Sequence, residues 1–155
     1  MWIAPENKDP VALHHPTRKA VGYYGAVRLR DGKFVYRREE ERFRGEGFWH
    51  FLLDLQKKSK ASGRQVIVIS DNAKYHHARL HQEWRETMAD EFRLYFLPPY
   101  SPELNPIERV WKRVRRNCLH NCYFTHLQEV IEAVESQFHK WKRRNDTLHR
   151  LCSII

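Results

Sequence analysis

The sequence predicts an α/β fold in which helices pack against a mixed sheet. Three observations indicate this class. A hairpin signal lies at Asp31-Gly32, an unbroken β-branched run lies at 66–69, and apolar residues at helical spacing surround that run. The expected order is hairpin, helix, strand, helix, strand, helix, helix. With 155 residues, the chain has the size of one domain.

The hairpin is the first regular element that we expect. Prolines interrupt any periodic pattern in residues 1–20, so this N-terminal segment is predicted to be irregular. Strand-like runs at 22–29 and 33–36 then flank Asp31-Gly32. Asp-Gly between two such runs is a strong short-range hairpin signal.

The middle of the chain alternates between helix and strand. Apolar residues follow helical spacing from Phe48 until Gly63 breaks the pattern. The β-branched run at 66–69 is typical of a central strand covered on both faces. A helix is expected over 77–88, and a further strand over 92–97 is ended by two prolines.

Two helices are predicted in the C-terminal part. Asn105 as N-cap and Pro106 at the first helical position form a helix-start signature. The last helix is expected over 125–144, where Thr125 as N-cap and Gln128 three residues later form a capping box. Its predicted core face consists of Leu127, Val130, Ile131, Val134, Phe138 and Trp141.

The charge of the chain limits the classes of partner. Lys and Arg number 28 against 19 Asp and Glu, which gives a net charge of +9. Such a surplus favours a polyanionic partner, most simply nucleic acid. Hydrophobic residues make up 41%, enough for a core, and no apolar run has the length of a membrane span. The N-terminus has no signal-peptide pattern and the three cysteines are an odd number, so a cytoplasmic, nucleoid-associated protein is expected.

Two carboxylates are candidate metal ligands. Asp71 follows the β-branched run directly, and ligands of open α/β sheets bind at the carboxyl ends of strands. An ordinary turn role for Asp71 is equally compatible with the sequence. Glu108 lies in the first turn of an expected helix, where it would also complete a capping box. If the two converge, they are suited to the pair of divalent cations that serves phosphoryl transfer.

Basic residues are concentrated after Glu108 and again near the C-terminus. The first group consists of Arg109, Lys112, Arg113, Arg115 and Arg116. The second consists of Lys140, Lys142, Arg143 and Arg144. Both groups are candidate contacts to a DNA backbone. A solvated helix face with a Glu108–Lys112 pair is the common alternative.

Two segments resemble the motifs of a known family. Residues 66–78, VIVISDNAKYHHA, are similar to the second-aspartate motif of DDE transposases. Residues 97–111, LPPYSPELNPIERVW, resemble their third-acid motif still more closely. Together they resemble the insertion sequence 630 family, the bacterial branch of the mariner superfamily. The resemblance extends from about Trp2 to the end, and the 36 residues between Asp71 and Glu108 suit it.

This resemblance implies an RNase H-like fold and a two-metal site for Mg²⁺ or Mn²⁺. The family hydrolyses DNA at the ends of a mobile element and uses the freed 3′-hydroxyl to attack target DNA, and its mariner-type members act as dimers. Asp71 would be the second metal-binding carboxylate and Glu108 the third. Asn72, His76 and Asn105 match motif positions and would have supporting roles.

The first aspartate of the family has no counterpart in this sequence. In the family it ends the first strand, ahead of a tryptophan that Trp2 matches. Asp9 and Asp31 end no expected strand, and Glu6 is no better placed. We therefore expect the C-terminal part of a catalytic domain that lacks its first strand. Alone it would be inactive, and an upstream transposase fragment is a possible source of the missing aspartate.

Two other interpretations stay open at this point. Cys118 with Cys122, and His149 with Cys152, have spacings within zinc-ligand ranges. Free cysteines more commonly behave as small buried hydrophobes. The chain is also compatible with a non-catalytic DNA-binding module derived from a transposase, whose DNA binding would be unaffected by Asp71→Asn.

Overall fold

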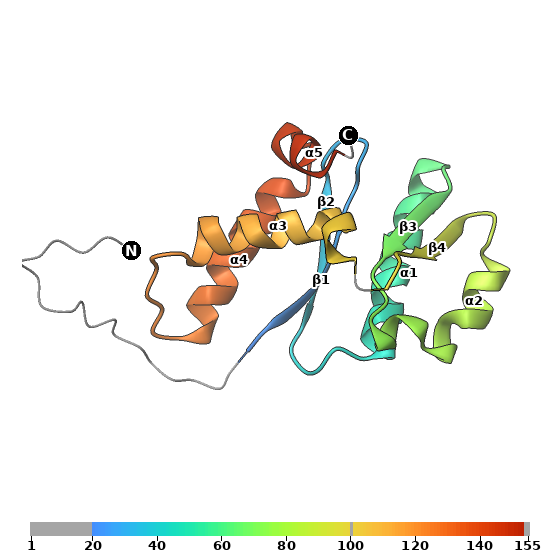
Figure 1. Ribbon diagram of the computed structural model, residues 1–155, viewed down its shortest axis with the longest axis horizontal. Helices are drawn as coiled ribbons and strands as arrows, with labels where there is room; N and C mark the ends of the chain where they lie inside the picture. Colours follow the sequence, from blue (N-terminus) through green and yellow to red (C-terminus); the bar gives the residue numbers. More distant parts are fainter. Residues whose placement is uncertain (1–19, 100, 154–155) are drawn as a thin grey trace, which may run out of the picture.

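The computed structural model describes residues 20–99 and 101–153 (Figure 1). All but the last residue of the irregular segment expected over 1–20 therefore lies outside the described residues, as do Trp2, Glu6 and Asp9. None of the described helices is long and apolar enough to cross a membrane.

The first two strands form the predicted hairpin. Strand β1 (Gly22–Val27) pairs antiparallel with β2 (Phe34–Glu39), which extends three residues beyond the expected run. Gly32 lies in the turn with a φ of +68°, a conformation that glycine adopts without steric cost. The Asp-Gly signal therefore predicted the turn correctly.

Helix α1 (Gly45–Ser62) follows and ends at Gly63, which has a left-handed φ of 61°. Strand β3 (Val66–Ser70) then pairs in parallel with β4 (Phe92–Phe96). Both strands and the helix agree with the sequence prediction.

The helix expected over 77–88 is wrong in its first half. Two 3₁₀ turns, Lys74–His77 and Arg79–His81, precede α2 (Gln82–Thr87). Ala78 between the turns has extended backbone, with φ −58° and ψ 133°. The side chain of His76 contacts Asp71 and Phe48, so tertiary contacts override the local helical pattern here.

The C-terminal part contains three α-helices rather than two. Helix α3 (Pro106–Val114) begins as predicted, because the side chain of Asn105 accepts the N–H of Ile107. It continues into a π-helical turn, Arg115–Leu119. Helix α4 (Leu127–Trp141) and a short unpredicted helix, α5 (Asp146–Cys152), are the last elements of the described residues.

The capping box predicted for the last helix is wrong. The N-cap of α4 is His126, not Thr125, and its side chain makes no capping hydrogen bond. Instead the backbone N–H of Thr125 donates to the carboxylate of Glu129 at 2.9 Å, and Gln128 donates to Glu132 at 3.0 Å. Val134, Phe138 and Trp141 of the predicted core face are buried, and its other members are half-buried.

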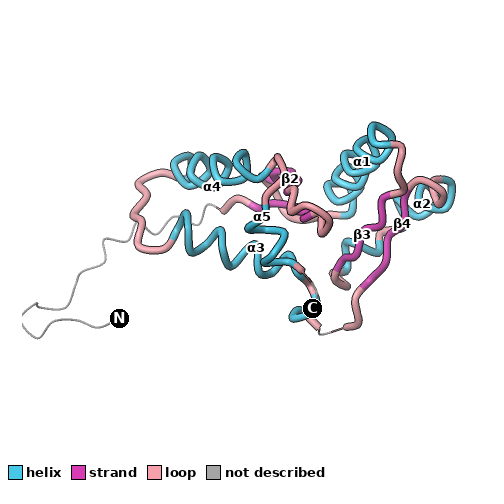
Figure 2. The backbone as a smooth tube through the Cα atoms, turned by 90° about the horizontal axis from the view of Figure 1, so that it is seen from above, coloured by secondary structure: helices cyan, strands magenta, loops and turns pink. Residues whose placement is uncertain are grey.

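The β1–β2 sheet separates two apolar cores. Alternate residues point to opposite faces, so Tyr23 contacts one core and Tyr24 belongs to the other. Figures 1 and 2 show α3, α4 and α5 on one side of this hairpin, and α1, α2 and the β3–β4 pair on the other. The first core contains Phe34, Val110, Val114, Cys118, Val134, Phe138, Trp141, Leu148 and Cys152. The second contains Tyr24, Phe48, Phe51, Leu52, Leu55 and Phe92.

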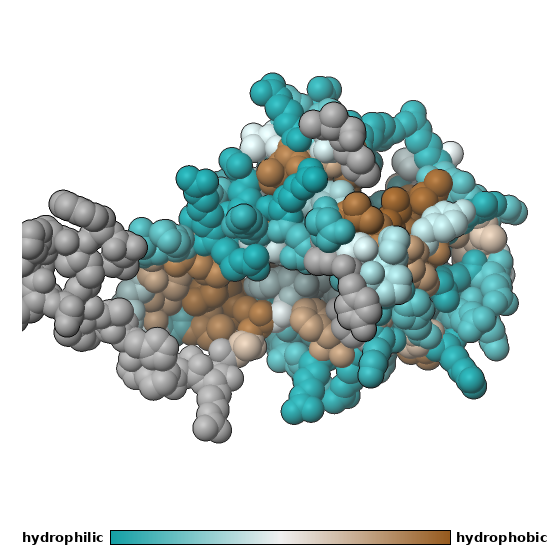
Figure 3. Space-filling view, viewed as in Figure 1, coloured by the Kyte–Doolittle hydropathy of each residue, from teal (hydrophilic) through white to brown (hydrophobic). Residues whose placement is uncertain are grey.

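The prediction that β3 is covered on both faces is wrong. Val66 and Val68 pack on the core under α1, but Ile67 is 58% exposed and Ile69 is 51% exposed. Tyr95, opposite Ile69 in the pair, is 50% exposed, and Figure 3 shows apolar surface over these strands. The α/β class is confirmed, but the described strands form two separate two-stranded sheets, and helices α3 to α5 pack on the β1–β2 pair.

Candidate active site

The candidate site lies where β3 and β4 end together. The N–H of Leu97 donates to the carbonyl of Ser70 at 2.8 Å, and the side-chain amide of Asn72 donates to the carbonyl of Leu97. Asp71 therefore follows directly on a fixed pair of strand ends. The chain then continues into α3, which packs against β1 and α5.

One oxygen of Asp71 is fully engaged by the protein. Oδ1 lies 2.8 Å from Nδ1 of His76 and accepts the backbone N–H of Ala73 at 3.1 Å. Within residues 20–99 and 101–153, no hydrogen bond or ion pair involves Oδ2. About half of the Asp71 side chain is exposed to solvent.

His76 is the buried partner in this contact. Its ring packs against Phe48 with a centroid separation of 4.0 Å. Nδ1 also lies 3.0 Å from the hydroxyl of Ser70 and 3.1 Å from the carbonyl of Asp71. Burial lowers the pKa of His76, although Asp71 opposes the shift, so the ring is neutral near pH 7. Two of the neighbouring oxygens can only accept, so we assign the proton to Nδ1.

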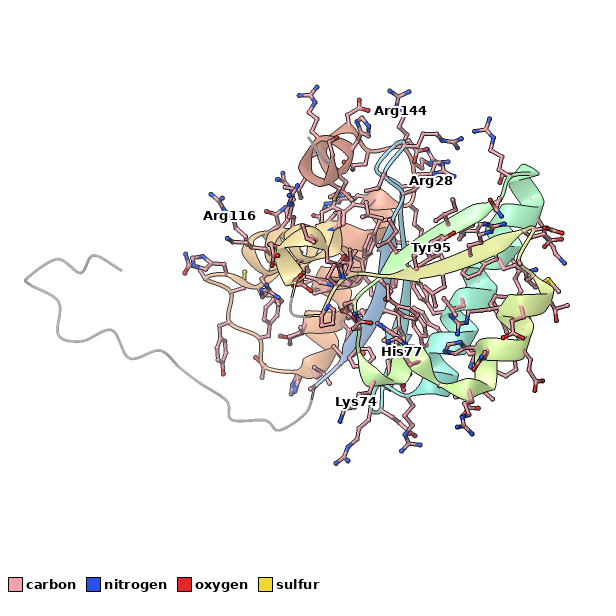
Figure 4. The ribbon with its side chains drawn as sticks, turned by 45° about the vertical axis from the view of Figure 1, so that its right-hand side comes forward. Arg28, Lys74, His77, Tyr95, Arg116 and Arg144 are labelled. Atoms are coloured by element: carbon pink, nitrogen blue, oxygen red, sulfur yellow. The ribbon has the colours of Figure 1, made fainter. Side chains whose placement is uncertain are left out.

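A second histidine is held beside the same strand ends. Nε2 of His77 lies 3.0 Å from Oδ1 of Asn72, and its ring stacks on Phe96 at 4.0 Å. Figure 4 shows His77 and Lys74 near this end of the molecule. His77 lies within the motif at 66–78 but was not among the predicted site residues. Asn72 thus joins β3, β4 and the 3₁₀ turn.

Glu108 is exposed in the first turn of α3, as predicted. No ion pair in the described part of the chain includes Glu108, so the alternative pair with Lys112 is not formed. Asn105, by contrast, is buried and has the role of N-cap. It fixes where the helix bearing Glu108 begins.

The two carboxylates fit a hard divalent cation. Mg²⁺ and Mn²⁺ prefer carboxylate oxygens, and Mg²⁺ commonly binds proteins through one or two carboxylates while it keeps several waters. Among the residues with described positions, no three His, Cys, Asp or Glu side chains gather into a metal-binding group. Asp71 and Glu108 each offer the donor chemistry that such a cation prefers.

The basic residues after Glu108 do not form one uniform stripe. Nη1 of Arg109 donates to the carbonyl of Leu151 at 3.1 Å, so this guanidinium binds the end of α5. Arg113 is half-buried, whereas Lys112 is exposed. Arg115 and Arg116 belong to the π-helical turn, and Figure 4 shows Arg116 well away from His77.

The second basic group lies at the C-terminal end of α4. The Nζ of Lys142 lies 5.4 Å from the ring centroid of Tyr36, and Arg144 pairs with Asp146 at 3.2 Å. Lys140 and Arg143 are exposed. Arg144 lies far from His77 in Figure 4.

The positions of the cysteines favour packing over zinc binding. Cys118 and Cys152 are buried in the first core, and burial raises the pKa of both thiols. The Sγ of Cys152 lies 3.7 Å from the carbonyl of Pro106. Cys122 is exposed, and His149 donates its backbone N–H to Asn145 within α5's first turn.

Comparison with known proteins identifies the family. The sequence matches the DDE superfamily endonuclease family over residues 2–131. It is 35% identical over 74 residues to the uncharacterized protein y4pE/y4sA of Sinorhizobium fredii (strain NBRC 101917 / NGR234), which covers 48% of this chain and 51% of that protein. The chain thus spans about half the length of this relative.

A solved structure supports the fold. The crystal structure of the Mos1 strand transfer complex matches with a TM-score of 0.68 and 18% identity, over 98% of this chain and 44% of that one. At this identity the similarity concerns the fold, and it confirms the predicted RNase H-like class. Because the family match covers most of the sequence, the chain belongs to the DDE superfamily endonucleases.

Proposed function

We propose that this chain acts in DNA transposition, as a catalytic domain of the insertion sequence 630 type that cleaves and transfers DNA strands with Mg²⁺ or Mn²⁺. The observation that carries the proposal is the carboxylate of Asp71 at the joined strand ends, held through Oδ1 on a half-exposed side chain. The net charge of +9 and the similarity to the Mos1 strand transfer complex support DNA as the substrate. Such a substrate implies action at the nucleoid.

The residues of the site have separate tasks in this mechanism. When bound, a pair of divalent cations stabilises the attacking and leaving oxygens of the phosphodiester. Asp71 would bind a cation through Oδ2, and Glu108 would bind through its exposed carboxylate. His76 orients Asp71 from the core, and Asn72 keeps the two strand ends together.

We propose that a further carboxylate comes from an added strand. The two sheets lie on the same helix, α1, but are not hydrogen-bonded to each other in the described structure. Strand β3 pairs there only with β4, so its other edge offers backbone groups to an extended segment. An upstream transposase fragment ending in an aspartate would complete the ligand set. A homodimer bound to element ends and target DNA would be the working assembly.

Nicking of supercoiled DNA tests this proposal. The purified chain is incubated with Mn²⁺, with and without the upstream transposase polypeptide. We expect Mn²⁺-dependent nicking when both are present, and its loss in Asp71→Asn and in Glu108→Gln. Asp90→Asn, an exposed carboxylate beyond α2, is the matched control and should retain activity.

The competing function gives a different result in the same experiment. DNA binding without nicking, equal in the wild type and in Asp71→Asn with or without Mn²⁺, would identify a non-catalytic DNA-binding module instead. Nicking that persists in Asp71→Asn would show that this carboxylate is not a metal ligand.

A further inference from the structure

The β1–β2 turn and the junction between α4 and α5 are held in direct backbone contact. The N–H of Asn145 donates to the carbonyl of Asp31 at 2.9 Å. A Cβ on Gly32 would come within 2.1 Å of the Asn145 carbonyl oxygen and 2.5 Å of the His149 nitrogen. Two segments far apart in the sequence therefore form one continuous surface, which we name the hairpin–α5 surface (residues 28–33 and 140–150).

Most of the net charge of the chain lies on this surface. Its two acidic residues are Asp31 and Asp146. Its eight basic residues are Arg28, Arg30, Lys33, Lys140, Lys142, Arg143, Arg144 and Arg150. The eight cations and two carboxylates give a net +6, against +9 for the whole chain.

Some of these cations are fixed and others are free to bind a partner. Arg28 donates to Asp31 through Nε at 2.7 Å, and Arg144 pairs with Asp146. Arg30, Arg143 and Arg150 are exposed and form no ion pair with any residue whose position is described. The surface thus combines a rigid backbone with guanidinium groups that face solvent.

The hairpin–α5 surface lies away from the part of the candidate active site that contains His77 (Figure 4), whereas the C-terminal end of α5 contacts α3 through Arg109. Figure 4 shows Arg28 and Arg144 together at one end of the molecule, while His77 and Lys74 lie toward the opposite end. The cations of this surface therefore lie apart from the turn that contains His77 (Figure 4) and are available to another part of a long polyanion.

We propose that the hairpin–α5 surface binds the phosphate backbone of duplex DNA away from the cleaved strand. The inference takes its partner, DNA, from the proposed function. Exposed guanidinium groups match phosphate oxygens with two parallel hydrogen bonds, and their binding releases counterions from the duplex. Contacts of this kind position DNA without reading its sequence.

The salt dependence of DNA binding tests the surface. Anisotropy of a labelled random-sequence duplex is measured in EDTA over a range of salt concentrations. The triple variant Arg30→Gln/Arg143→Gln/Arg150→Gln is compared with Lys57→Gln/Lys58→Gln/Lys60→Gln, which removes the same charge from α1. We expect the slope of log K against log salt to fall by about one per lost cation, about three in all, in the first variant only.

Each other outcome overturns the inference. An unchanged slope in the Arg30→Gln/Arg143→Gln/Arg150→Gln variant would show that this surface does not bind the DNA backbone. An equal decrease in slope in this variant and in the α1 lysine variant would show that the surface is not a preferred DNA-binding site. Tighter binding to phosphatidylserine vesicles than to DNA, lost in the same variant, would assign the surface to a membrane. The double variant Arg143→Gln/Arg150→Gln, expected to lose about two units of slope, replaces the triple if that variant melts at a lower temperature than the wild type.

The proposed strand cleavage is tested independently of this binding. EDTA removes divalent cations, so the slopes do not depend on cleavage. Absence of nicking together with the expected slopes would contradict the proposed function and leave the DNA-binding surface intact.

Discussion

Nδ1 of His76 lies 2.8 Å from Oδ1 of Asp71, and this contact joins the apolar core to the exposed end of β3. The side chain of His76 is only 7% exposed, whereas that of Asp71 is 51% exposed. The ring cannot turn freely because it packs on Phe48. A carboxylate that would otherwise rotate in solvent is therefore held through one oxygen, whereas the other makes no hydrogen bond or ion pair with the residues whose positions are described.

We predict that His76→Ala weakens Mn²⁺ binding by about 10- to 100-fold, as loss of a residue that orients a metal ligand typically does. Asn places its amide nitrogen near the position of Nδ1, so His76→Asn should recover part of the affinity. Electron paramagnetic resonance of free Mn²⁺ during a titration measures both. The matched control is His50→Ala, an exposed histidine on α1.

The Mn²⁺ titration distinguishes the role of His76 in orienting Asp71 from its role in packing the core. Loss of a buried ring also lowers the free energy of unfolding, so all variants are titrated well below their melting temperatures. Equal Mn²⁺ affinity in His76→Ala and the wild type would refute the orienting role.

The sequence predicted the local elements well and the burial of β3 poorly, for a physical reason. Asp31-Gly32 and Asn105-Pro106 act through their own backbone conformations and side-chain hydrogen bonds, so a single sequence contains the necessary information. Whether Ile67 is covered depends on which elements pack above it. A β-branched run cannot report that.

In the candidate site, too, the features set by local sequence were predictable and those set by tertiary packing were not. The two carboxylates were predicted as candidates from their positions after a strand and in a first helical turn, and the structure has them at those positions. The buried contact between His76 and Asp71 depends on Phe48, which precedes β3 by a whole helix. The docking of α5 on the β1–β2 turn likewise needs the tertiary fold, since no local pattern joins Gly32 to Asn145.

Acid should destabilise the hairpin through Asp31. Its hydrogen bonds with Arg28 hold the pKa of the Asp31 carboxyl below its usual range. A carboxyl with a lowered folded-state pKa stabilises the protein above its unfolded pKa of about 3.9, and this contribution disappears as the pH falls through the folded-state pKa. We expect Asp31→Asn to reduce the loss of stability between pH 7 and acid, as measured by urea midpoints. Asp90→Asn should leave that loss unchanged.

The contact of Gly32 with α5 gives a prediction about stability. Alanine at this position would keep a φ of +68° and place a Cβ 2.1 Å from a backbone oxygen of Asn145. Gly63→Ala is a matched control, because Gly63 has a φ of +61° but no atom within 4 Å of the added Cβ. We expect Gly63→Ala to cost about 1 kcal/mol of unfolding free energy from the left-handed backbone alone.

Gly32→Ala should cost at least about 2 kcal/mol more than the control, since backbone atoms must move to admit the Cβ. Urea denaturation of both variants gives the difference. If the two glycines prove equally tolerant, the hairpin turn and α5 are not packed as closely as the backbone contact indicates.

Asn105 distinguishes a structural role from a direct role in metal binding. Its Oδ1 accepts the N–H of Ile107, and it is buried at the start of the helix that carries Glu108. We expect Asn105→Ala to lower the free energy of unfolding by about 1 kcal/mol, the usual effect of losing an N-cap. Asn105→Ser keeps a capping oxygen and should restore most of this stability.

Because the N-cap does not itself bind the cation, the Mn²⁺ affinity of the folded Asn105→Ser variant should match that of the wild type. A Ser variant with normal stability and tenfold weaker Mn²⁺ binding would instead place the amide of Asn105 among the groups that contact the metal or its waters.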